Sequence, residues 1–148
     1  MSAETDMIKL YSGRILALAA DMPRTTRLPN PTATAKKRSP LCGSTVTVDV
    51  QVQDGVITDY AQDVKACALG QAAAAIVGNA IVGLRQTQVQ TGRDQLLDML
   101  KNDGPPPGAP FADLEVLAPA KDYKNRHASI LLAFDATLEA LETYQATA

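Results

Sequence analysis

Three residues of this 148-residue chain pair a metal-binding atom with a place at the edge of an expected helix or strand. They are Cys42, Cys67 and His127, which are the two cysteines and the single histidine of the chain. Cys42 precedes an alternating strand, Cys67 opens a helix of small residues, and His127 lies in the first turn of the last helix. Two thiolates and one imidazole suit zinc or iron. The sequence therefore predicts a metal site at these residues.

The spacing of the three residues leaves other interpretations open. The separations, 67 − 42 = 25 and 127 − 67 = 60, match no short zinc signature. A lone cysteine is commonly a small buried apolar residue, and a lone histidine is commonly a hydrogen-bonded structural residue. A further interpretation is a thiol enzyme with Cys67 as the nucleophile and His127 as its base.

Hydrophobic periodicity predicts the strands that would position these residues. Residues 45–52, TVTVDVQV, alternate apolar and polar side chains as a half-buried strand does. The Asp54-Gly55 pair predicts a tight turn into a second strand at 56–64. Because two strands alone are marginally stable, we expect a third from the threonine- and proline-rich segment 22–40.

The alternation also predicts which side chains of the first strand are buried. We expect Thr47 and Asp49 on one face and the valines on the other, against the helices. The valines are Val46, Val48, Val50 and Val52.

Helical patterns flank the strands. They cover residues 6–21, 67–83, 91–103, 110–117 and 126–144. Neither a repeat nor a shift in composition divides the chain, so we expect one domain spanning residues 1–148. The predicted fold is α+β: a small, mainly antiparallel three-stranded sheet with helices packed on one face.

Composition narrows the classes of function. The formal net charge of −2 argues against nucleic acid as a partner, because phosphate binding needs clustered lysine and arginine. No stretch approaches the ~20 apolar residues of a membrane span, and the acidic N-terminus lacks the apolar core of a signal peptide. We therefore expect a cytoplasmic protein whose two cysteines are free thiols or metal ligands.

The segment SPLCGSTVTVDVQVQDGVITDYAQDVKACALGQAAAA, residues 39–75, resembles the U-type iron–sulfur cluster scaffolds: IscU, SufU and the N-terminal domain of NifU. That family has a motif of the type N-P-x-C-G-D before a strand, a hairpin with Asp-Gly, and a second cysteine that opens a small-residue helix. The segments SPLCGS, QDG and KACALGQAAAA occupy these places in order. The resemblance extends from Leu10 to Leu141.

The resemblance implies an IscU/NifU-like fold and a function. The protein would be an iron–sulfur cluster assembly scaffold or carrier that binds iron, zinc or a cluster through Cys42, Cys67 and His127. It would bind cargo and hand it on, and would not be an enzyme. Its implied partners are a cysteine desulfurase and iron–sulfur acceptor proteins.

The chain also departs from the family pattern. Ser44 replaces the aspartate that lies two residues after the first cysteine in the family pattern, and the third cysteine is missing. One alignment puts Ser129 in its place, and a shift of one or two residues offers His127 instead. A [2Fe–2S] cluster usually takes four protein ligands. The alternative function is therefore a scaffold-derived interaction module with a vestigial metal site. The native metal, sulfur acceptance and oligomeric state stay open.

Overall fold

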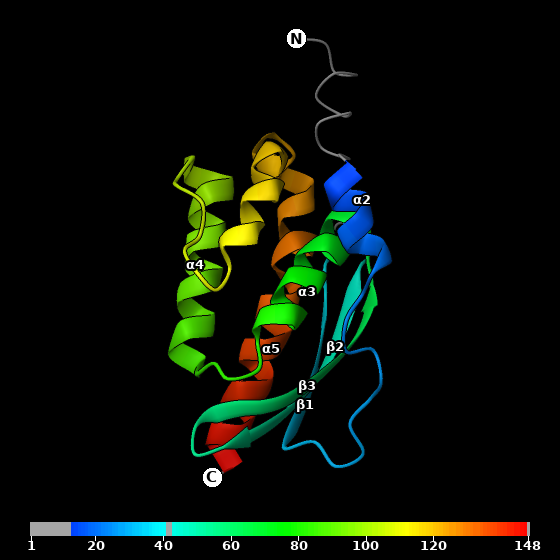
Figure 1. Cartoon of the computed structure of the whole chain (residues 1–148), viewed down its shortest axis with the longest axis vertical. Coiled ribbons are helices and arrows are strands. Elements are labelled where there is room, and N and C mark those ends of the chain that lie inside the picture. The colour runs from blue at the N-terminus through cyan, green and yellow to red at the C-terminus, as the bar shows by residue number, and fades with distance from the viewer. Residues whose placement is uncertain (1–12, 41–42, 148) are drawn as a thin grey trace.

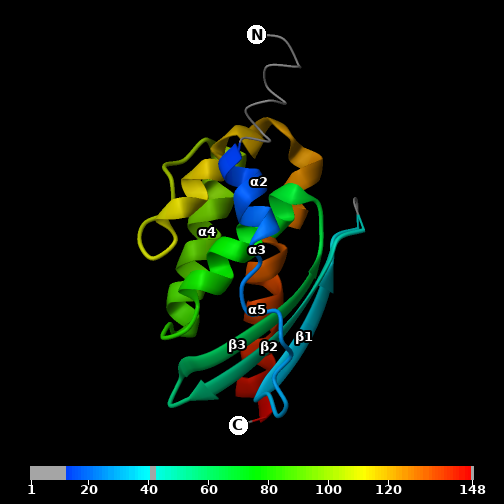
Figure 2. The same cartoon turned by 45° about the vertical axis from the view of Figure 1, so that its right-hand side comes forward.

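The computed structural model describes residues 13–40 and 43–147, with side chains to Tyr144. Three antiparallel strands form one sheet in the order β1-β2-β3. Their bounds are β1 Ala33–Arg38, β2 Thr45–Gln53 and β3 Val56–Lys65. The two strands expected at 45–52 and 56–64 are confirmed, and the third strand does come from the segment before Cys42. Figure 2 shows the helices gathered on one side of this sheet, as the sequence predicts.

The helices follow the strands in chain order, after a first helix that precedes them. They are α2 Gly13–Ala20, α3 Ala68–Ala80, α4 Gln86–Asn102, the 3₁₀ helices η1 Ala112–Asp122 and η2 Lys124–Arg126, and α5 His127–Thr147. Helix α5 packs on β1 and β2, and α3 packs on β3, α2 and α5. Helix α4 lies at the side of this helical layer, farther from the sheet than α3 (Figure 1). Among the described residues, no helix has the length and apolar character needed to span a membrane.

Four helix predictions were wrong at a boundary: α3 ends at Ala80 and α5 at Thr147, each three residues from the expected end, and two others differ by five residues. Helix α4 begins at Gln86, five residues before the expected start at position 91. The side-chain oxygen of Gln88 accepts a hydrogen bond from the backbone N–H of Arg85 and so caps a polar first turn. The expected helix at 110–117 is a 3₁₀ helix that extends farther, to Asp122.

The valine face of β2 forms the floor of the core. Val46, Val48 and Val50 are at most 1% exposed, which confirms the predicted register. Val52 is only partly buried, because the pairing of β2 with β3 shifts between Gln51 and Val52.

The opposite face of β2 holds a buried carboxylate. Asp49 lies opposite the valines as predicted, but its side chain is fully buried. Its oxygens accept hydrogen bonds from Arg27 at 2.6 and 2.9 Å and from Thr34 at 2.7 Å. The backbone N–H of Leu28 donates a fourth, at 3.1 Å. These hydrogen bonds lower the pKa of Asp49, and the contribution from Arg27 is the largest. They also hold the segment before β1 against the outer face of the sheet.

Candidate metal centre

Cys67 occupies the predicted boundary between strand and helix. It is the N-cap residue of α3, with extended backbone angles, and its side chain makes no capping hydrogen bond. The thiol is free and partly buried. Because the sulfur neither caps the helix nor is sealed in the core, it remains available for chemistry.

Two hydroxyl groups lie next to this thiol. The hydroxyl oxygen of Ser129, in the first turn of α5, is 3.7 Å from the Cys67 sulfur. Ser129 in turn donates a hydrogen bond of 3.1 Å to the hydroxyl of Ser44, just before β2. Both serines are at most 5% exposed. The partly buried thiol and the two buried hydroxyls therefore form one cluster, which we call the Cys67 cluster, at the meeting point of α3, α5 and β2.

Gly70 makes this convergence possible. A Cβ atom at Gly70 would lie 2.6 Å from the hydroxyl oxygen of Ser129 and 3.1 Å from its carbonyl oxygen. Only a residue without a side chain lets α3 approach α5 so closely. The sequence analysis noted the small residues of this helix but did not identify Gly70 as a contact beside the thiol.

His127 begins α5 and has a different environment. Its ring is 3% exposed, and Nε2 donates a hydrogen bond of 2.9 Å to the carbonyl oxygen of Ala120. Since two residues turn about 200° around a helix axis, His127 and Ser129 leave α5 on different sides. Of these two side chains, Ser129 is the one that the structure places beside the Cys67 sulfur.

Cys42 lies outside the described residues, so the ligand set Cys42, Cys67 and His127 stays a prediction. Within residues 13–40 and 43–147, no three histidine, cysteine or acidic side chains form a group that could hold a metal ion. The donors beside Cys67 are hydroxyls, which bind iron or zinc poorly at neutral pH. One soft thiolate suits an iron–sulfur cluster or zinc, and such cargo would need further ligands.

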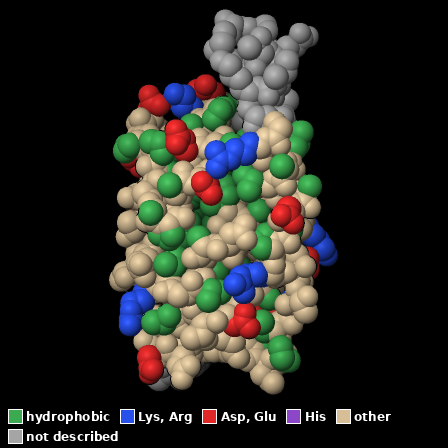
Figure 3. All heavy atoms as spheres, in the orientation of Figure 1, with side chains coloured by type: hydrophobic (Ala, Val, Ile, Leu, Met, Phe, Trp, Pro, Cys, Tyr) green, Lys and Arg blue, Asp and Glu red, His purple; other side chains and the backbone are tan. Residues whose placement is uncertain are grey.

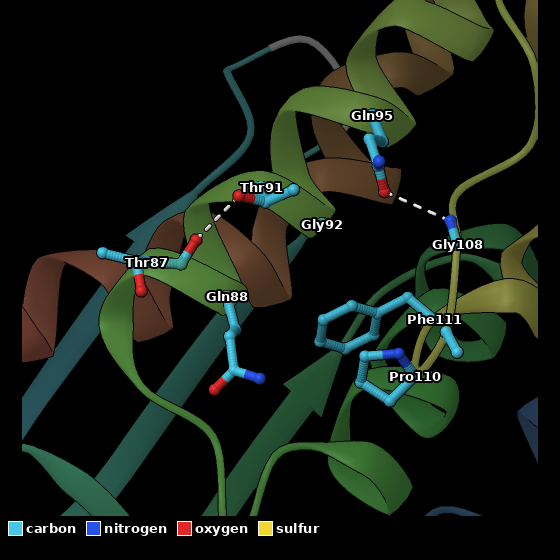
Figure 4. Close-up of a pocket in the computed structure, with 9 residues that line it drawn as sticks. Thr87, Gln88, Thr91, Gly92, Gln95, Gly108, Pro110 and Phe111 are labelled. Carbon is cyan, nitrogen blue, oxygen red and sulfur yellow. Dashed lines mark hydrogen bonds between the residues drawn. The ribbon is translucent and has the colours of Figure 1, made fainter.

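A hollow whose lining does not include Cys67 lies between α4 and the loop before η1 (Figure 4). Its lining is uncharged and consists of Thr87, Gln88, Thr91, Gly92, Gln95, Gly108, Ala109, Pro110 and Phe111. The side chain of Gln95 accepts a hydrogen bond of 3.2 Å from the N–H of Gly108 and ties the loop to the helix. With neither a thiol nor a charged group in its lining, this hollow is no candidate for the metal.

The surface gives no sign of a nucleic-acid interface on the face drawn in Figure 3. Basic and acidic side chains are interspersed there, without a patch of a single sign. A phosphate-binding surface needs a cluster of lysine and arginine, which this face lacks.

Comparison with known proteins identifies the family. No family model matches the chain. The crystal structure of a nitrogen-fixing NifU-like protein (N-terminal) from Brucella abortus superposes with a TM-score of 0.94. It is 43% identical and covers 97% of this chain and 99% of that one. The chain belongs to the NifU-like family of U-type scaffolds. This membership confirms the resemblance seen at residues 39–75.

Two further relatives agree with the NifU-like assignment. The iron–sulfur cluster assembly scaffold protein IscU of Thermotoga maritima is 24% identical over 133 residues, which cover 90% of this chain and 93% of the relative. A putative iron–sulfur cluster assembly scaffold protein for the SUF system, from Fervidobacterium islandicum AW-1, is 18% identical with a TM-score of 0.76. It covers 90% of this chain and 98% of its own, and it supports the fold alone.

Proposed function

We propose that this NifU-like protein acts in iron–sulfur cluster assembly as a scaffold or carrier, with iron or a cluster as its cargo. The observation that carries the proposal is the Cys67 cluster: a free, partly buried thiol at the N-terminus of α3, beside α5. A thiolate is the protein ligand that iron–sulfur clusters use. The protein would bind cargo in the cytoplasm and pass it on, without turning over a substrate.

The proposed ligands are Cys42 and Cys67, and the third position has two candidates. His127 is the candidate from the sequence, because imidazole binds both zinc and iron. Ser129 is the candidate from the contacts, since its hydroxyl lies 3.7 Å from the Cys67 sulfur. With only two cysteines, the chain would hold a cluster less tightly than a scaffold with three, which suits transient loading.

Anaerobic reconstitution with iron and sulfide tests the proposal. The wild type should retain iron and show visible absorption, and Cys67→Ala and Cys42→Ala should each lose both. His127→Ala and Ser129→Ala form a matched pair, and the variant with the larger loss of iron identifies the third ligand. If the two cysteine variants retain as much iron as the wild type, the proposed site is wrong. Bound zinc in protein purified without a tag would instead indicate a zinc site.

The proposed partners are a cysteine desulfurase and acceptor proteins, by analogy with the assembly function of the relatives. A second candidate function keeps the partner but not the cargo: an interaction module with a vestigial site. The serines at positions 44 and 129 favour this alternative, because neither supplies a charged ligand. Calorimetry with a desulfurase separates the two functions. Binding that is unchanged in Cys67→Ala, together with no retained metal in the wild type, would support the module.

A further inference from the structure

The two edges of the sheet differ in what they offer to another chain. At the β3 edge, the N–H of Ile57 donates a hydrogen bond of 2.9 Å to the carbonyl oxygen of Leu84, and its own carbonyl oxygen accepts one of 2.7 Å from Gly83. Farther along, the N–H of Gln62 donates a bond of 2.9 Å to the carbonyl oxygen of Arg24. Strand β1 forms the opposite margin, and Figure 2 shows no labelled element beyond it. An unpaired edge is a template for a further strand.

The backbone groups on the free side of β1 follow from the register. Ser39, directly after β1, donates a hydrogen bond of 2.8 Å to the carbonyl oxygen of Ser44, in register with the pairing of β1 and β2. Residues of an antiparallel strand face their partner alternately, so the N–H and C=O groups of Thr34, Lys36 and Arg38 point away from β2. Within the described residues, no hydrogen bond reaches these backbone groups.

The side chains along this edge are basic. Lys36 and Arg38 are exposed on the outer face of the sheet, and neither forms an ion pair in the part of the chain that the structure describes. Lys37 points to the other face and pairs with Glu139 of α5 at 3.6 Å. Asp63, in line with Lys36 across the sheet, lies on β3, about 10 Å away at the usual strand spacing. The free edge therefore presents positive charge.

This charge decides which kind of chain can pair with the edge. A second copy of β1 would bring its own Lys36, Lys37 and Arg38 beside the same residues, and like charges opposite each other in a sheet are destabilising. Lysine on an edge strand is one of the ways in which natural proteins prevent such self-pairing. An acidic strand has the opposite effect, because each carboxylate opposite Lys36 or Arg38 adds a favourable cross-strand pair.

We propose that the free edge of β1 binds an extended acidic segment of a partner protein as an added antiparallel strand. The backbone groups of the segment pair with those of Thr34, Lys36 and Arg38, as in other cases of strand addition. Antiparallel pairing is slightly more stable per residue than parallel pairing. Since directly opposed residues share a face, acidic side chains at alternate positions of the segment lie beside Lys36 and Arg38. The residues between them face the helical side of the sheet, beside the buried Ala35. The docking does not depend on the proposed cargo.

Hydrogen exchange of the edge amides tests the proposal, with a short synthetic peptide in which glutamate and valine alternate. Saturating peptide should slow the exchange of the amides of Thr34, Lys36 and Arg38 about tenfold or more, since each gains a hydrogen bond. The amides of Ala35 and Lys37 already face β2 and should change little. A peptide of the same composition with its glutamates in one block has the same charge but the wrong spacing, and should bind about fivefold more weakly.

Two variants at one position separate the backbone contact from the charge. Lys36→Gln keeps the edge N–H and removes the charge, so it should weaken peptide binding about two- to fivefold, as expected for one exposed ion pair. Lys36→Pro also removes the N–H, which faces away from β2, so the sheet should persist and binding should fall about fivefold further. Lys101→Gln, at the end of α4, removes the same charge elsewhere and should leave affinity unchanged. Circular dichroism checks the fold, and Arg38→Pro with Arg38→Gln repeats the comparison should Lys36→Pro not fold.

Three results would overturn the proposal. Equal protection by the alternating and the blocked peptide would show attraction by charge alone. Equal affinities of Lys36→Gln and Lys36→Pro would exclude pairing through the backbone of the edge. Protection of the edge amides that rises with protein concentration, without any peptide, would identify a second copy of this chain as the occupant.

Discussion

Replacing Gly70 by alanine will press α3 against α5 beside Cys67. The added Cβ would lie 2.6 Å from the Ser129 hydroxyl oxygen, 2.9 Å from the Cβ of Ala66 and 3.1 Å from the Ser129 carbonyl oxygen. The hydroxyl has little room to move, because Ser129 is 1% exposed and bonded to Ser44. The carbonyl belongs to the backbone of α5, so the helices themselves must separate.

The magnitude follows from two opposing effects. Overpacking a core by one methyl group costs about 1–3 kcal/mol. Exchanging glycine for alanine inside a helix returns up to about 1 kcal/mol of helix propensity. We therefore expect Gly70→Ala to lower the free energy of unfolding by about 1–2 kcal/mol, which for a chain of this size lowers the Tm by about 3–6 °C.

Urea and thermal unfolding followed by circular dichroism measure this loss. Gly13→Ala is the matched control, because a Cβ there meets nothing within 4 Å and the same exchange should be neutral or stabilising. Adding Ser129→Ala to Gly70→Ala removes the nearest atom, so the double variant should lose less stability than the two single losses combined. A Gly70→Ala protein as stable as the wild type would refute the close approach of the two helices.

Three further changes test the sheet, each by urea unfolding. Val48→Asp should cost about 3 kcal/mol or more, because it buries an unpaired charge on the core face; a smaller loss would contradict the register. Asp49→Asn should lower the free energy of unfolding at neutral pH. As the pH falls, the free energy of unfolding of this variant should decline less steeply than that of the wild type. Arg27 holds the pKa of Asp49 below its usual value, so the wild-type contribution is present above about pH 4 and is lost as the pH falls through the lowered pKa; parallel pH profiles would rule this out. Tyr60→Phe removes the 2.9 Å hydrogen bond to Thr137 and should cost about 1 kcal/mol, and an unchanged midpoint would show that the bond contributes nothing.

Local pattern was enough to predict the sheet and the place of the thiol. The alternation at 45–52 determines which side chains of β2 share a face, because the side-chain period of a strand is two residues. The Asp54-Gly55 pair determines the hairpin, since few other pairs adopt the positive φ angles of 55° and 80° found there. The start of α3 after Cys67 follows from the change from the two-residue period of a strand to the 3.6-residue period of a helix. All three features depend only on neighbouring residues.

Only the tertiary structure decided which residues meet. The sequence offered both His127 and Ser129 as partners for Cys67, and the rotation of α5 against α3 brings Ser129 to the thiol and leaves the His127 ring bonded to the carbonyl oxygen of Ala120. That rotation is set by core packing along the whole of α5, which no local pattern encodes. Asp49 is a similar case: its strand position was predictable, but its burial depends on Arg27, which reaches it from a segment without regular structure. Such contacts join residues far apart in the chain, and folding selects them by mutual fit.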